Sequence, residues 1–416
     1  MVKWQPVLLA NVHRPNSEKI ATYLDHGGYE SLRKALKMSP EEIISEVKAS
    51  GLRGRGGAGF PTGVKWSFIS KDAPVKYLAV NTDEGEPGTF KDRLIVERDP
   101  HSILEGVIIS AYAVGANRAF VYIRGEFFLG VKRWIKAISD AYQHGFLGKD
   151  ILGSGFDLDV TVHRGAGAYI CGEETAMIES LEGKRGIPRS KPPYPAQKGL
   201  WEKPTIVQNV ETLSNIPHII LNGAKWYSGI GTEKSKGMKI FCVSGHVNSP
   251  GNFELPLGTP LREIIYEHAG GIRMGHDIKA IIPGGSSTPI ISAERIAVPM
   301  AFETLQAAGT ALGTGAIIVM DETTDMVEVI RRTTRFFVHE SCGKCLPCRL
   351  GGKQMLNLLE NLSAGKGSMK DIDDLEYLAK GIYGKTFCPL GTGMAEPVLS
   401  ALRLFRDDFE KKITTH

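Results

Sequence analysis

The 416-residue chain lacks the features that mark several classes of protein. Its formal net charge is only +4, and it has no long basic run of the kind expected of a dedicated nucleic-acid-binding protein. The longest stretch without a charged residue, Thr304 to Met320, is interrupted by glycines and is too short for a spanning helix. The apolar start from Val7 to Ala10 is too short for a signal peptide. We therefore expect a cytoplasmic protein with no transmembrane segment and no nucleic-acid partner.

Cysteine is also scarce, with only six in the whole chain. This number is too small for a disulfide scaffold in a chain of this length. Hydrophobic residues make up 42%, which is typical of soluble globular proteins and argues against disorder. At about 100–200 residues per domain, the length predicts two to four domains.

The first of three regions, residues 1–236, has the pattern of an α/β domain. Strand-like runs alternate with helical patterns, which predicts a mostly parallel sheet. One helix has a clear start, because Ser39 is followed by Pro40 and by Glu42 three residues after the serine. The predicted strands are 77–80, 119–123 and 158–162, and the predicted helices are 40–49, 101–114, 129–142 and 174–182.

The rest of the chain divides into two regions of different character. Residues 237–324 contain short β-like pieces, such as 239–243 and 280–282, with one helix near 260–269, and predict a small β-rich module. Residues 325–416 are dominated by helical patterns and predict a helical bundle. Its predicted helices are 325–338, 349–363, 371–382 and 395–413.

Four of the six cysteines lie in this helical region. Cys342, Cys345 and Cys348 follow a C-x2-C-x2-C pattern, and Cys388 comes after a helical excursion. A tight loop with three thiolates and one distant cysteine is the pattern expected of a 4Fe-4S cluster. Structural zinc is the alternative, although zinc sites usually have two separated C-x2-C pairs.

A glycine-rich loop, Gly54–Gly59, matches the dinucleotide fingerprint G-x-G-x-x-G. The match is weak, because the fingerprint requires a preceding strand and here the predicted helix 40–49 precedes it. The bare backbone can still approach a phosphate or a flat ring. Lys65 is then a candidate contact for a phosphate or a flavin. Phe60 and Phe68 would offer a stacking surface, although core packing is the more common place for phenylalanine.

Three carboxylates, Asp83, Glu84 and Glu86, lie in the loop that follows the predicted strand 77–80. Loops at the carboxyl ends of parallel strands carry the binding sites of α/β proteins. Acids packed this closely need hydroxyls, amides or cations as partners, which favours a sugar-rich or polyol ligand. A magnesium site and a solvated acidic turn are the alternatives.

A second strand-loop-helix unit places Glu173 and Glu174 at the start of the predicted helix 174–182. Acids at this position favour the helix dipole, so both could be purely structural. The functional alternative is that Glu174 accepts hydrogen bonds from ribose hydroxyls and repels a 2′-phosphate, as acids do in NAD sites.

Six motifs in the same order make the chain resemble the NADH-binding, FMN-containing subunit of respiratory complex I, its 51 kDa-type F subunit. The resemblance covers nearly the full length. It implies a Rossmann-like FMN domain, a β-grasp module of the ubiquitin-like, soluble-ligand-binding type, and a four-helix bundle that holds a 4Fe-4S cluster. The motifs are Arg53–Gly63, Asn81–Arg93, Cys171–Thr175, Lys191–Pro195, Val210–Thr212 and Glu340–Arg349.

The resemblance also assigns cofactor contacts. Two positions depart from the family pattern: Gln208 stands where a second asparagine is common, and Tyr194 stands where phenylalanine is common. The implied FMN contacts are Lys65, Asn81, Asp83, Glu84, Tyr169, Gly172, Glu173, Asn209 and Thr212. The implied NADH contacts are the loop Gly54, Arg55, Gly56, Gly57, Ala58 and Gly59, then Phe60 and Phe68 around the adenine, Glu86 near the nicotinamide and Glu174 near the adenosine ribose.

The activity that the resemblance implies is hydride transfer from NADH to FMN, followed by single-electron transfer to the cluster and onward toward quinone. No side chain is needed as a catalytic acid or base. The implied partners are a thioredoxin-like 2Fe-2S subunit and a large iron-sulfur subunit, in a complex at the inner face of the cell membrane. A diaphorase subunit of an NAD-linked hydrogenase or formate dehydrogenase is the nearest alternative, and a non-catalytic scaffold is a more distant one.

Overall fold

The computed structural model describes residues 5–70 and 72–413, which form two compact units. The first unit contains the chain up to Gly85 together with Phe90–Phe241 and Glu254–Thr259. The second contains Glu86–Thr89, Cys242–Phe253 and the chain from Pro260 onward. Within the described ranges, no helix is both long enough and apolar enough to cross a membrane.

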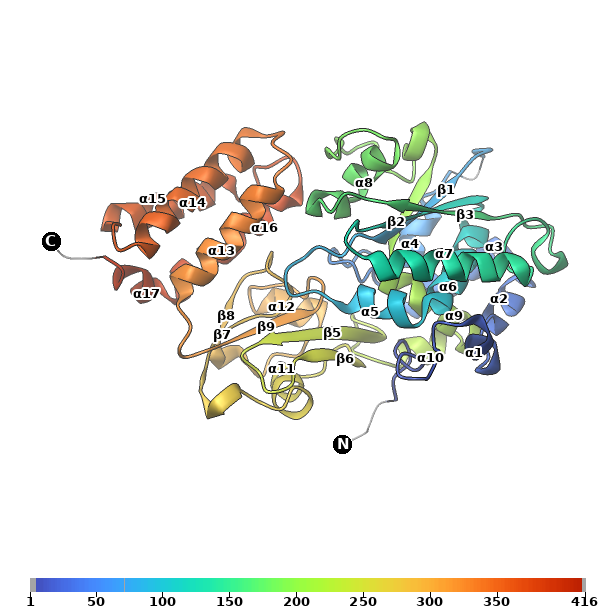
Figure 1. Ribbon diagram of the computed structural model, residues 1–416, viewed down its shortest axis with the longest axis horizontal. Coiled ribbons are helices and arrows are strands. Elements are labelled where there is room, and N and C mark those ends of the chain that lie inside the picture. The colour runs from blue at the N-terminus through green and yellow to red at the C-terminus, as the bar shows by residue number, and fades with distance from the viewer. Residues whose placement is uncertain (1–4, 71, 414–416) are drawn as a thin grey trace. The chain divides into compact units, whose positions relative to one another are not determined.

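The first unit is built on a four-stranded sheet, of which Figure 1 labels β1, β2 and β3. The order of its strands is β3-β2-β1-β4. All three strand pairings are parallel, which confirms the mostly parallel sheet predicted from the sequence. The predicted strands correspond to β1, β2 and β3, whereas the sequence pattern does not predict β4. The bounds are β1 Tyr77–Thr82, β2 Arg118–Ile123, β3 Asp159–Arg164 and β4 Thr205–Asn209.

Helices surround this sheet, and their ends follow from local sequence. The first predicted helix begins as expected, since Ser39 and Glu42 form a reciprocal capping box, and it stops at Gly51 with φ 70°. The helices are α1 Ile20–Asp25, α2 Glu30–Ala35, α3 Pro40–Ser50, α4 Thr62–Ser67, α5 Lys91–Arg98, α6 Pro100–Val114, α7 Phe128–Gln143, α8 Glu174–Leu181, α9 Val210–Asn222 and α10 Ala224–Ser228.

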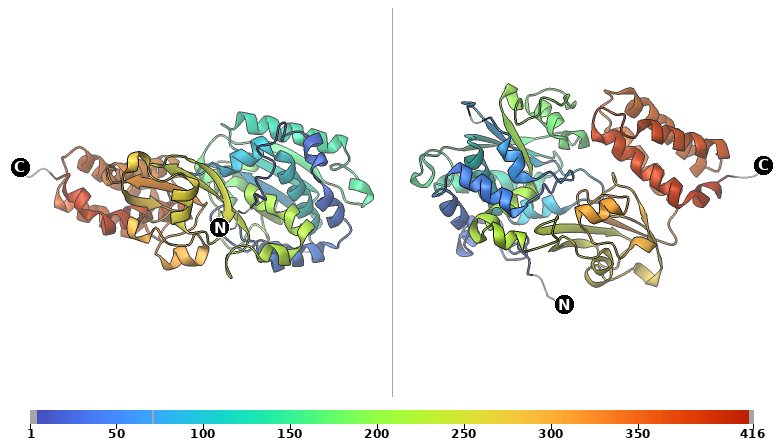
Figure 2. Two further views of the ribbon diagram at one scale, coloured as in Figure 1. Left: turned by 90° about the horizontal axis from the view of Figure 1, so that it is seen from below. Right: turned by 180° about the vertical axis from the view of Figure 1, so that it is seen from behind.

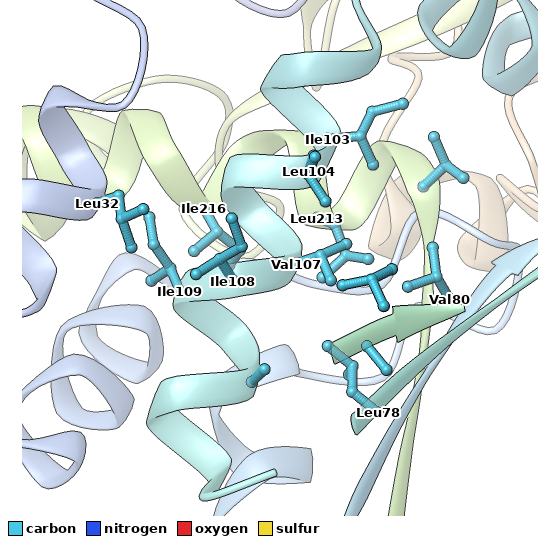
Figure 3. Close-up of a cluster of buried hydrophobic side chains, with 14 of the residues drawn as sticks. Leu32, Leu78, Val80, Ile103, Leu104, Val107, Ile108, Ile109, Leu213 and Ile216 are labelled. Atoms are coloured by element: carbon cyan, nitrogen blue, oxygen red, sulfur yellow. The ribbon is translucent and has the colours of Figure 1, made fainter. Parts of the chain in front are cut away.

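The core of the first unit lies where α6 and α9 pack on each other and on β1 (Figure 3). Nearly every residue of α6 is buried, including the polar His101, Ser102 and Glu105, so other parts of the protein cover this helix on all sides. The two helices approach closely at Gly106, where an added Cβ would lie 2.1 Å from the Leu213 carbonyl oxygen. The sequence therefore needs glycine at this point for a packing reason.

A Gly106→Ala variant should be destabilised by about 1–3 kcal/mol or more, because the new methyl group would force α6 away from α9. The matched control is Gly381→Ala, which lies in a helix and whose added Cβ would meet nothing within 4 Å. There alanine should leave stability unchanged or raise it by up to about 1 kcal/mol. Urea unfolding measures both, and equal effects at the two sites would contradict the close approach.

A five-stranded mixed sheet has the order β6-β5-β9-β7-β8, and most of its residues belong to the second unit. Strand β9 pairs in parallel with β5 and antiparallel with β7, and β7 pairs antiparallel with β8. The β-rich module predicted from the sequence is therefore present, and its expected helix is α11 followed by a π-helical turn at Ile264–His268. The bounds are β5 Met238–Gly245, β6 Gly251–Pro256, α11 Leu261–Glu263, β7 Ile278–Ile282, β8 Ile291–Ser292, α12 Phe302–Ala307 and β9 Ala316–Asp321.

The carboxyl-terminal helices of this unit pack side by side (Figure 2). The last predicted helix, 395–413, is wrong at its start and in its continuity. Helix α16 begins at Pro389, directly after the extended Cys388, and the chain leaves helical geometry at Phe405. The bounds are α13 Met326–Glu340, α14 Gly352–Ser363, α15 Met369–Ile382, α16 Pro389–Leu404 and α17 Arg406–Glu410.

The early start of α16 depends on two glycines that would be typical of a loop. An added Cβ on Gly391 would lie 2.3 Å from the Thr386 side chain, and one on Gly393 would lie 2.8 Å from Cβ of Ser287. Both glycines therefore allow close packing inside a helix. Glycine normally disfavours a helix interior, so the local sequence argues against the helix that these two residues form part of.

Candidate functional site

The loop after β1 and the turn Tyr169–Gly172 are joined at the carboxyl end of the sheet. Asn81 makes this connection, because its Nδ2 donates to the Gly172 carbonyl oxygen at 2.9 Å and its Oδ1 accepts from the Asp83 amide at 3.0 Å. Gly172 approaches the backbone of Asp83 closely, so a Cβ there would lie 3.4 Å from the Asp83 carbonyl oxygen. These predicted contact residues are therefore brought together.

A second set of predicted contact residues lies at the carboxyl end of β4. Asn209 caps α9, since its Oδ1 accepts from the amides of Glu211 at 3.0 Å and Thr212 at 3.4 Å. The Thr212 hydroxyl oxygen in turn accepts from the Arg55 amide at 2.8 Å. A Cβ on Gly56 would lie only 3.1 Å from Asn209 Cβ. The glycine-rich loop thus lies directly against the start of α9.

The glycine-rich loop connects α3 to α4, so the helix that precedes it is confirmed and the dinucleotide fingerprint does not apply. The Gly54 amide donates to the Phe60 carbonyl oxygen at 2.8 Å, which closes the loop on itself. Gly57 has φ 122° and Gly59 has φ 65°, conformations that favour glycine. The Arg55 side chain is 1% exposed and donates to the carbonyl oxygens of residues 236 and 238. Arg55 therefore offers only its backbone to the loop surface.

Exposed aromatic side chains accompany this loop. Phe60 is 47% exposed and Phe68 is 57% exposed, and their ring centroids are 6.2 Å apart. The expectation of ordinary core packing is therefore wrong for both, because Phe60 follows a surface loop and Phe68 ends a short helix. Tyr194 is also exposed, at 55%. Such rings can stack on a flat ligand.

Two lysines surround Glu174. The Lys65 Nζ lies 3.1 Å from Glu174 Oε2 and donates to the Val207 carbonyl oxygen at 2.8 Å. The Lys191 Nζ lies 2.7 Å from Glu174 Oε1 and 2.8 Å from Glu173 Oε1. Burial opposes the ionisation of Glu174, but the charges of Lys65 and Lys191 outweigh it and hold its pKa below the ordinary value.

Glu173 and Glu84 bind the backbone at helix starts. Glu173 Oε2 accepts from the amides of Thr175 and Ala176, both at 2.9 Å, so this side chain caps α8. Glu84 accepts from the amides of Asp92 at 2.8 Å and Arg93 at 2.9 Å, at the start of α5. Burial raises the pKa of Glu84 to about 7, and the nearby Asp92 adds to the shift.

Gln208 lies on β4, next to Asn209 in the chain, and is buried, with 5% of its surface exposed. Among the described residues, its Nε2 has no hydrogen-bond partner. A buried amide without a partner is costly and usually has one in the functional state, either a ligand or an ordered water. Gln208 is therefore suited to donate to a bound cofactor.

A buried ionic network next to Asn209 was not predicted. Glu211 is fully buried and lies 2.9 Å from the Lys91 Nζ and 2.7 Å from the Lys239 Nζ. Asp92 joins the network through Lys91 at 2.6 Å and through the Asn209 amide at 2.6 Å. Glu211 lies in one of the six motifs, but the local sequence does not indicate that its side chain is buried, since α9 also carries other polar residues.

The cysteine loop lies between α13 and α14 in the second unit. Burial raises the pKa of the Cys348 thiol, and the charges of the neighbouring Cys345 and Cys342 add to the shift. The Lys344 Nζ lies 3.4 Å from the ring centroid of Phe387, which places the loop next to the residue before Cys388. The donor set therefore suits an iron-sulfur cluster. Within residues 5–70 and 72–413, no group of three or more His, Cys, Asp or Glu side chains is placed to hold a metal ion.

Three family models match consecutive parts of the chain. The Nuo51 FMN-binding domain matches residues 47–218, and the SLBB domain matches residues 239–320. The NADH-ubiquinone oxidoreductase-F iron-sulfur binding region matches residues 328–412. Fold, site and matches together define a flavin-dependent NADH dehydrogenase subunit that carries an iron-sulfur cluster.

Full-length relatives identify the family. The chain is 54% identical to the F 2 subunit of NADH-quinone oxidoreductase from Rhizobium meliloti (strain 1021), over 98% of this chain and 97% of the relative. It is 50% identical to the corresponding F subunit of Streptomyces coelicolor, over 98% of this chain and 91% of the relative. The chain belongs to the family of NADH-quinone oxidoreductase F subunits. Its function is the oxidation of NADH through FMN and a 4Fe-4S cluster.

A solved structure with a different assembly is also similar. The crystal structure of NAD+-reducing [NiFe]-hydrogenase in the air-oxidized state matches with a TM-score of 0.86 and 35% identity, over 99% of this chain and 68% of that chain. This identity is lower than that to the two F subunits. The comparison therefore favours the respiratory enzyme over the hydrogenase diaphorase alternative. Membership in an enzyme family also sets aside the scaffold alternative.

Proposed function

We propose that the carboxyl end of the parallel sheet in the first unit holds FMN. The observation that carries this proposal is that two hydrogen-bonded pairs of segments lie at the ends of the paired strands β1 and β4. Asn81 joins the loop after β1 to the turn Tyr169–Gly172, and Thr212 joins the glycine-rich loop to the start of α9. Ligands of open parallel sheets bind at this end. The FMN contacts proposed by resemblance are Lys65, Asn81, Asp83, Glu84, Tyr169, Gly172, Glu173, Asn209 and Thr212, with Gln208 as an additional amide donor.

FMN supplies the redox chemistry when bound, since it accepts a hydride from NADH and can release electrons singly to an iron-sulfur cluster. The chain supplies the surroundings. The bare backbone of Gly54–Gly59 allows a ring or phosphate to approach closely, and the fixed amides at the ends of β1 and β4 orient the flavin. No side chain of the chain is proposed as a catalytic acid or base.

The proposed NADH site adds exposed groups around the same loop. Phe60, Phe68 and Tyr194 offer aromatic faces for the adenine. Glu174 accepts from the adenosine ribose hydroxyls, and Glu86 lies near the nicotinamide. The carboxylate of Glu174 sits beside two lysines, so its charge decides whether the position attracts or repels a phosphate.

A Glu174→Gln variant should use NADPH better relative to NADH. The change removes the negative charge that repels the 2′-phosphate and leaves Lys65 and Lys191 free to attract it. We expect the ratio of kcat/KM for NADPH to that for NADH to rise about tenfold or more. Steady-state kinetics with both nucleotides measure this ratio. The exposed Glu202→Gln variant is the control, and an unchanged ratio in Glu174→Gln would contradict the assignment.

For the cluster, we propose the four thiolates of Cys342, Cys345, Cys348 and Cys388 as ligands. The C-x2-C-x2-C spacing of the first three cysteines and the contact of their loop with Phe387, next to Cys388, support this set. A neighbouring positive charge, as on Lys344, would favour the reduced form of the cluster.

The finer architecture is also a proposal. We assign a Rossmann-like FMN and NADH domain to residues 1–236, a β-grasp module to 237–324 and a four-helix bundle to 325–416. The parallel sheet, the mixed five-stranded sheet and the packed helices α13 to α16 support these assignments.

We further propose that the chain works with a thioredoxin-like 2Fe-2S subunit and a large iron-sulfur subunit, in the cytoplasm at the inner face of the cell membrane. The similarity to the F subunits of NADH-quinone oxidoreductase supports this assembly. The diaphorase alternative rests on the similarity to the NAD+-reducing hydrogenase. Purification of the native complex and identification of its components would distinguish the two.

An anaerobic titration of the cofactor-loaded protein with NADH tests the proposed function. Visible absorbance should show bleaching of the flavin, and low-temperature EPR should show a new cluster signal. A loaded sample that NADH reduces at neither centre would contradict the proposal.

A further inference from the structure

The short segment Glu86–Thr89 belongs to the second unit, although the residues on both sides of it belong to the first. Gly88 has φ 92°, and a Cβ there would lie 2.8 Å from Cδ1 of Ile318 on β9. The Thr89 and Thr314 hydroxyl oxygens are 2.6 Å apart. The turn that carries Glu86 is therefore fixed on the β-rich module.

Within that module, one loop surrounds the Glu86 side chain. The Glu86 carboxylate is buried, and its Oε1 accepts from the Ser287 amide at 2.7 Å and from the Ser286 hydroxyl at 3.2 Å. Gly285 has φ 100°, and a Cβ there would lie 2.8 Å from Glu86 Cγ. We call Gly285–Ser287 the clamp loop. Its glycine makes room for the side chain, and its two donors fix one carboxylate oxygen.

The clamp loop is itself held in place from two directions. The Gly285 amide donates to the Ala316 carbonyl oxygen of β9 at 2.8 Å. Ser287 packs against Gly393 of α16, and nearby the Ile290 amide donates to the Ser400 hydroxyl of the same helix at 2.9 Å. A loop supported by a strand and a helix holds its donors rigidly.

We propose that the clamp loop is a positioning element of the nucleotide site, which fixes the Glu86 carboxylate in the orientation that receives the nicotinamide of NADH. This inference rests on the proposed placement of Glu86 near the nicotinamide. In this role Ser286 and Ser287 act on the nucleotide through Glu86, to which both donate. A hydrogen-bonded carboxylate needs no reorganisation when the nucleotide binds, so losing the clamp weakens binding.

The experiment uses the FMN- and cluster-loaded protein with Ser286→Ala and Gly285→Ala. Calorimetry gives the Kd of NAD+, and steady-state kinetics give KM and kcat for NADH. We expect Ser286→Ala to weaken binding by about fivefold and Gly285→Ala by more, because removing one hydrogen bond to a charged group costs less than displacing the group. Flavin content and the cluster EPR signal should match those of the wild type. Ser249→Ala, at an exposed position of the same module, is the control and should change nothing.

Combination with Glu86→Gln separates the outcomes. If the clamp acts through Glu86, Ser286→Ala should add little to the effect of Glu86→Gln, whereas an equal effect in both backgrounds would overturn the inference. Wild-type binding in Glu86→Gln would contradict the proposed role of Glu86 itself. Weakened binding in Glu86→Gln with wild-type binding in Ser286→Ala would overturn the clamp alone. Should Gly285→Ala fail to fold, Ser286→Ala and the double variant decide the question.

Discussion

A Cys388→Ser variant should lose the 4Fe-4S EPR signal while NADH still bleaches the flavin. The loop with Cys342, Cys345 and Cys348 can supply three thiolates, but a cubane cluster has four iron corners. A serine hydroxyl is a poor substitute for a thiolate at neutral pH. Electron transfer from the protein to its downstream acceptor should fall by more than about a hundredfold, because the loss of residues that merely support a metal ligand already costs 10–100-fold.

The matched control for this variant is Cys242→Ala. Cys242 is also buried, but it lies on β5 among apolar residues and outside the proposed ligand set. This variant should keep the cluster signal and lose only some stability. A Cys388→Ser sample with a cluster signal of full intensity would show that another residue is the fourth ligand.

Hydrophobic patterns were sufficient to predict much of the secondary structure. The apolar runs of β1, β2 and β3 and the capping box of α3 are local signals, and each element formed where it was expected. Strand β4 was missed because its five residues carry no alternation and follow a proline-rich segment. The order of strands in each sheet depends on contacts far apart in sequence, so no local pattern could give it.

Glycine was the least reliable signal, because the same residue serves loops and close packing. The predicted helix 395–413 leaves out Gly391 and Gly393, yet both lie inside α16, where Thr386 and Ser287 leave no room for a side chain. Gly106 is likewise inside a helix, α6, because the Leu213 carbonyl oxygen leaves no room for a side chain. Leu213 and Ser287 are far from their glycines in the sequence, and only Thr386 is close to its glycine, Gly391.

The candidate site was predictable where its residues are local in the chain. The spacing of Cys342 to Cys348 is read directly from the sequence. The partners of Glu86 lie about 200 residues away, at Ser286 and Ser287, so only the structure could reveal them. The exposure of Phe60 could not be predicted from the sequence either. Phenylalanine is usually buried, and the sequence does not show that Phe60 follows a loop at the surface.

A Glu211→Gln variant should lose about 3–5 kcal/mol of unfolding free energy, because it leaves buried lysines without their carboxylate. Lys91 and Lys239 are each 1% exposed at the side chain, and both contact Glu211 within 3 Å. Glutamine has nearly the same shape, so lost charge rather than lost packing causes the effect. Urea unfolding at pH 7 measures it. As a control, Lys198→Ala breaks an exposed ion pair with Glu202 and should cause no measurable change.

The pH dependence provides a sharper test of the same network. Burial opposes the ionisation of Glu211, but Lys239 and Lys91 outweigh it and hold its pKa below the ordinary value of 4.5. A carboxyl group with a lowered pKa in the folded state adds stability above its unfolded pKa and loses that stability as the pH falls through the folded value. The deficit of Glu211→Gln relative to the wild type should therefore be complete at pH 7 and shrink below pH 4.5. A deficit that stays constant down to the acid limit would show that Glu211 acts through shape and hydrogen bonding, as in its contact with the Ile240 amide, rather than through charge.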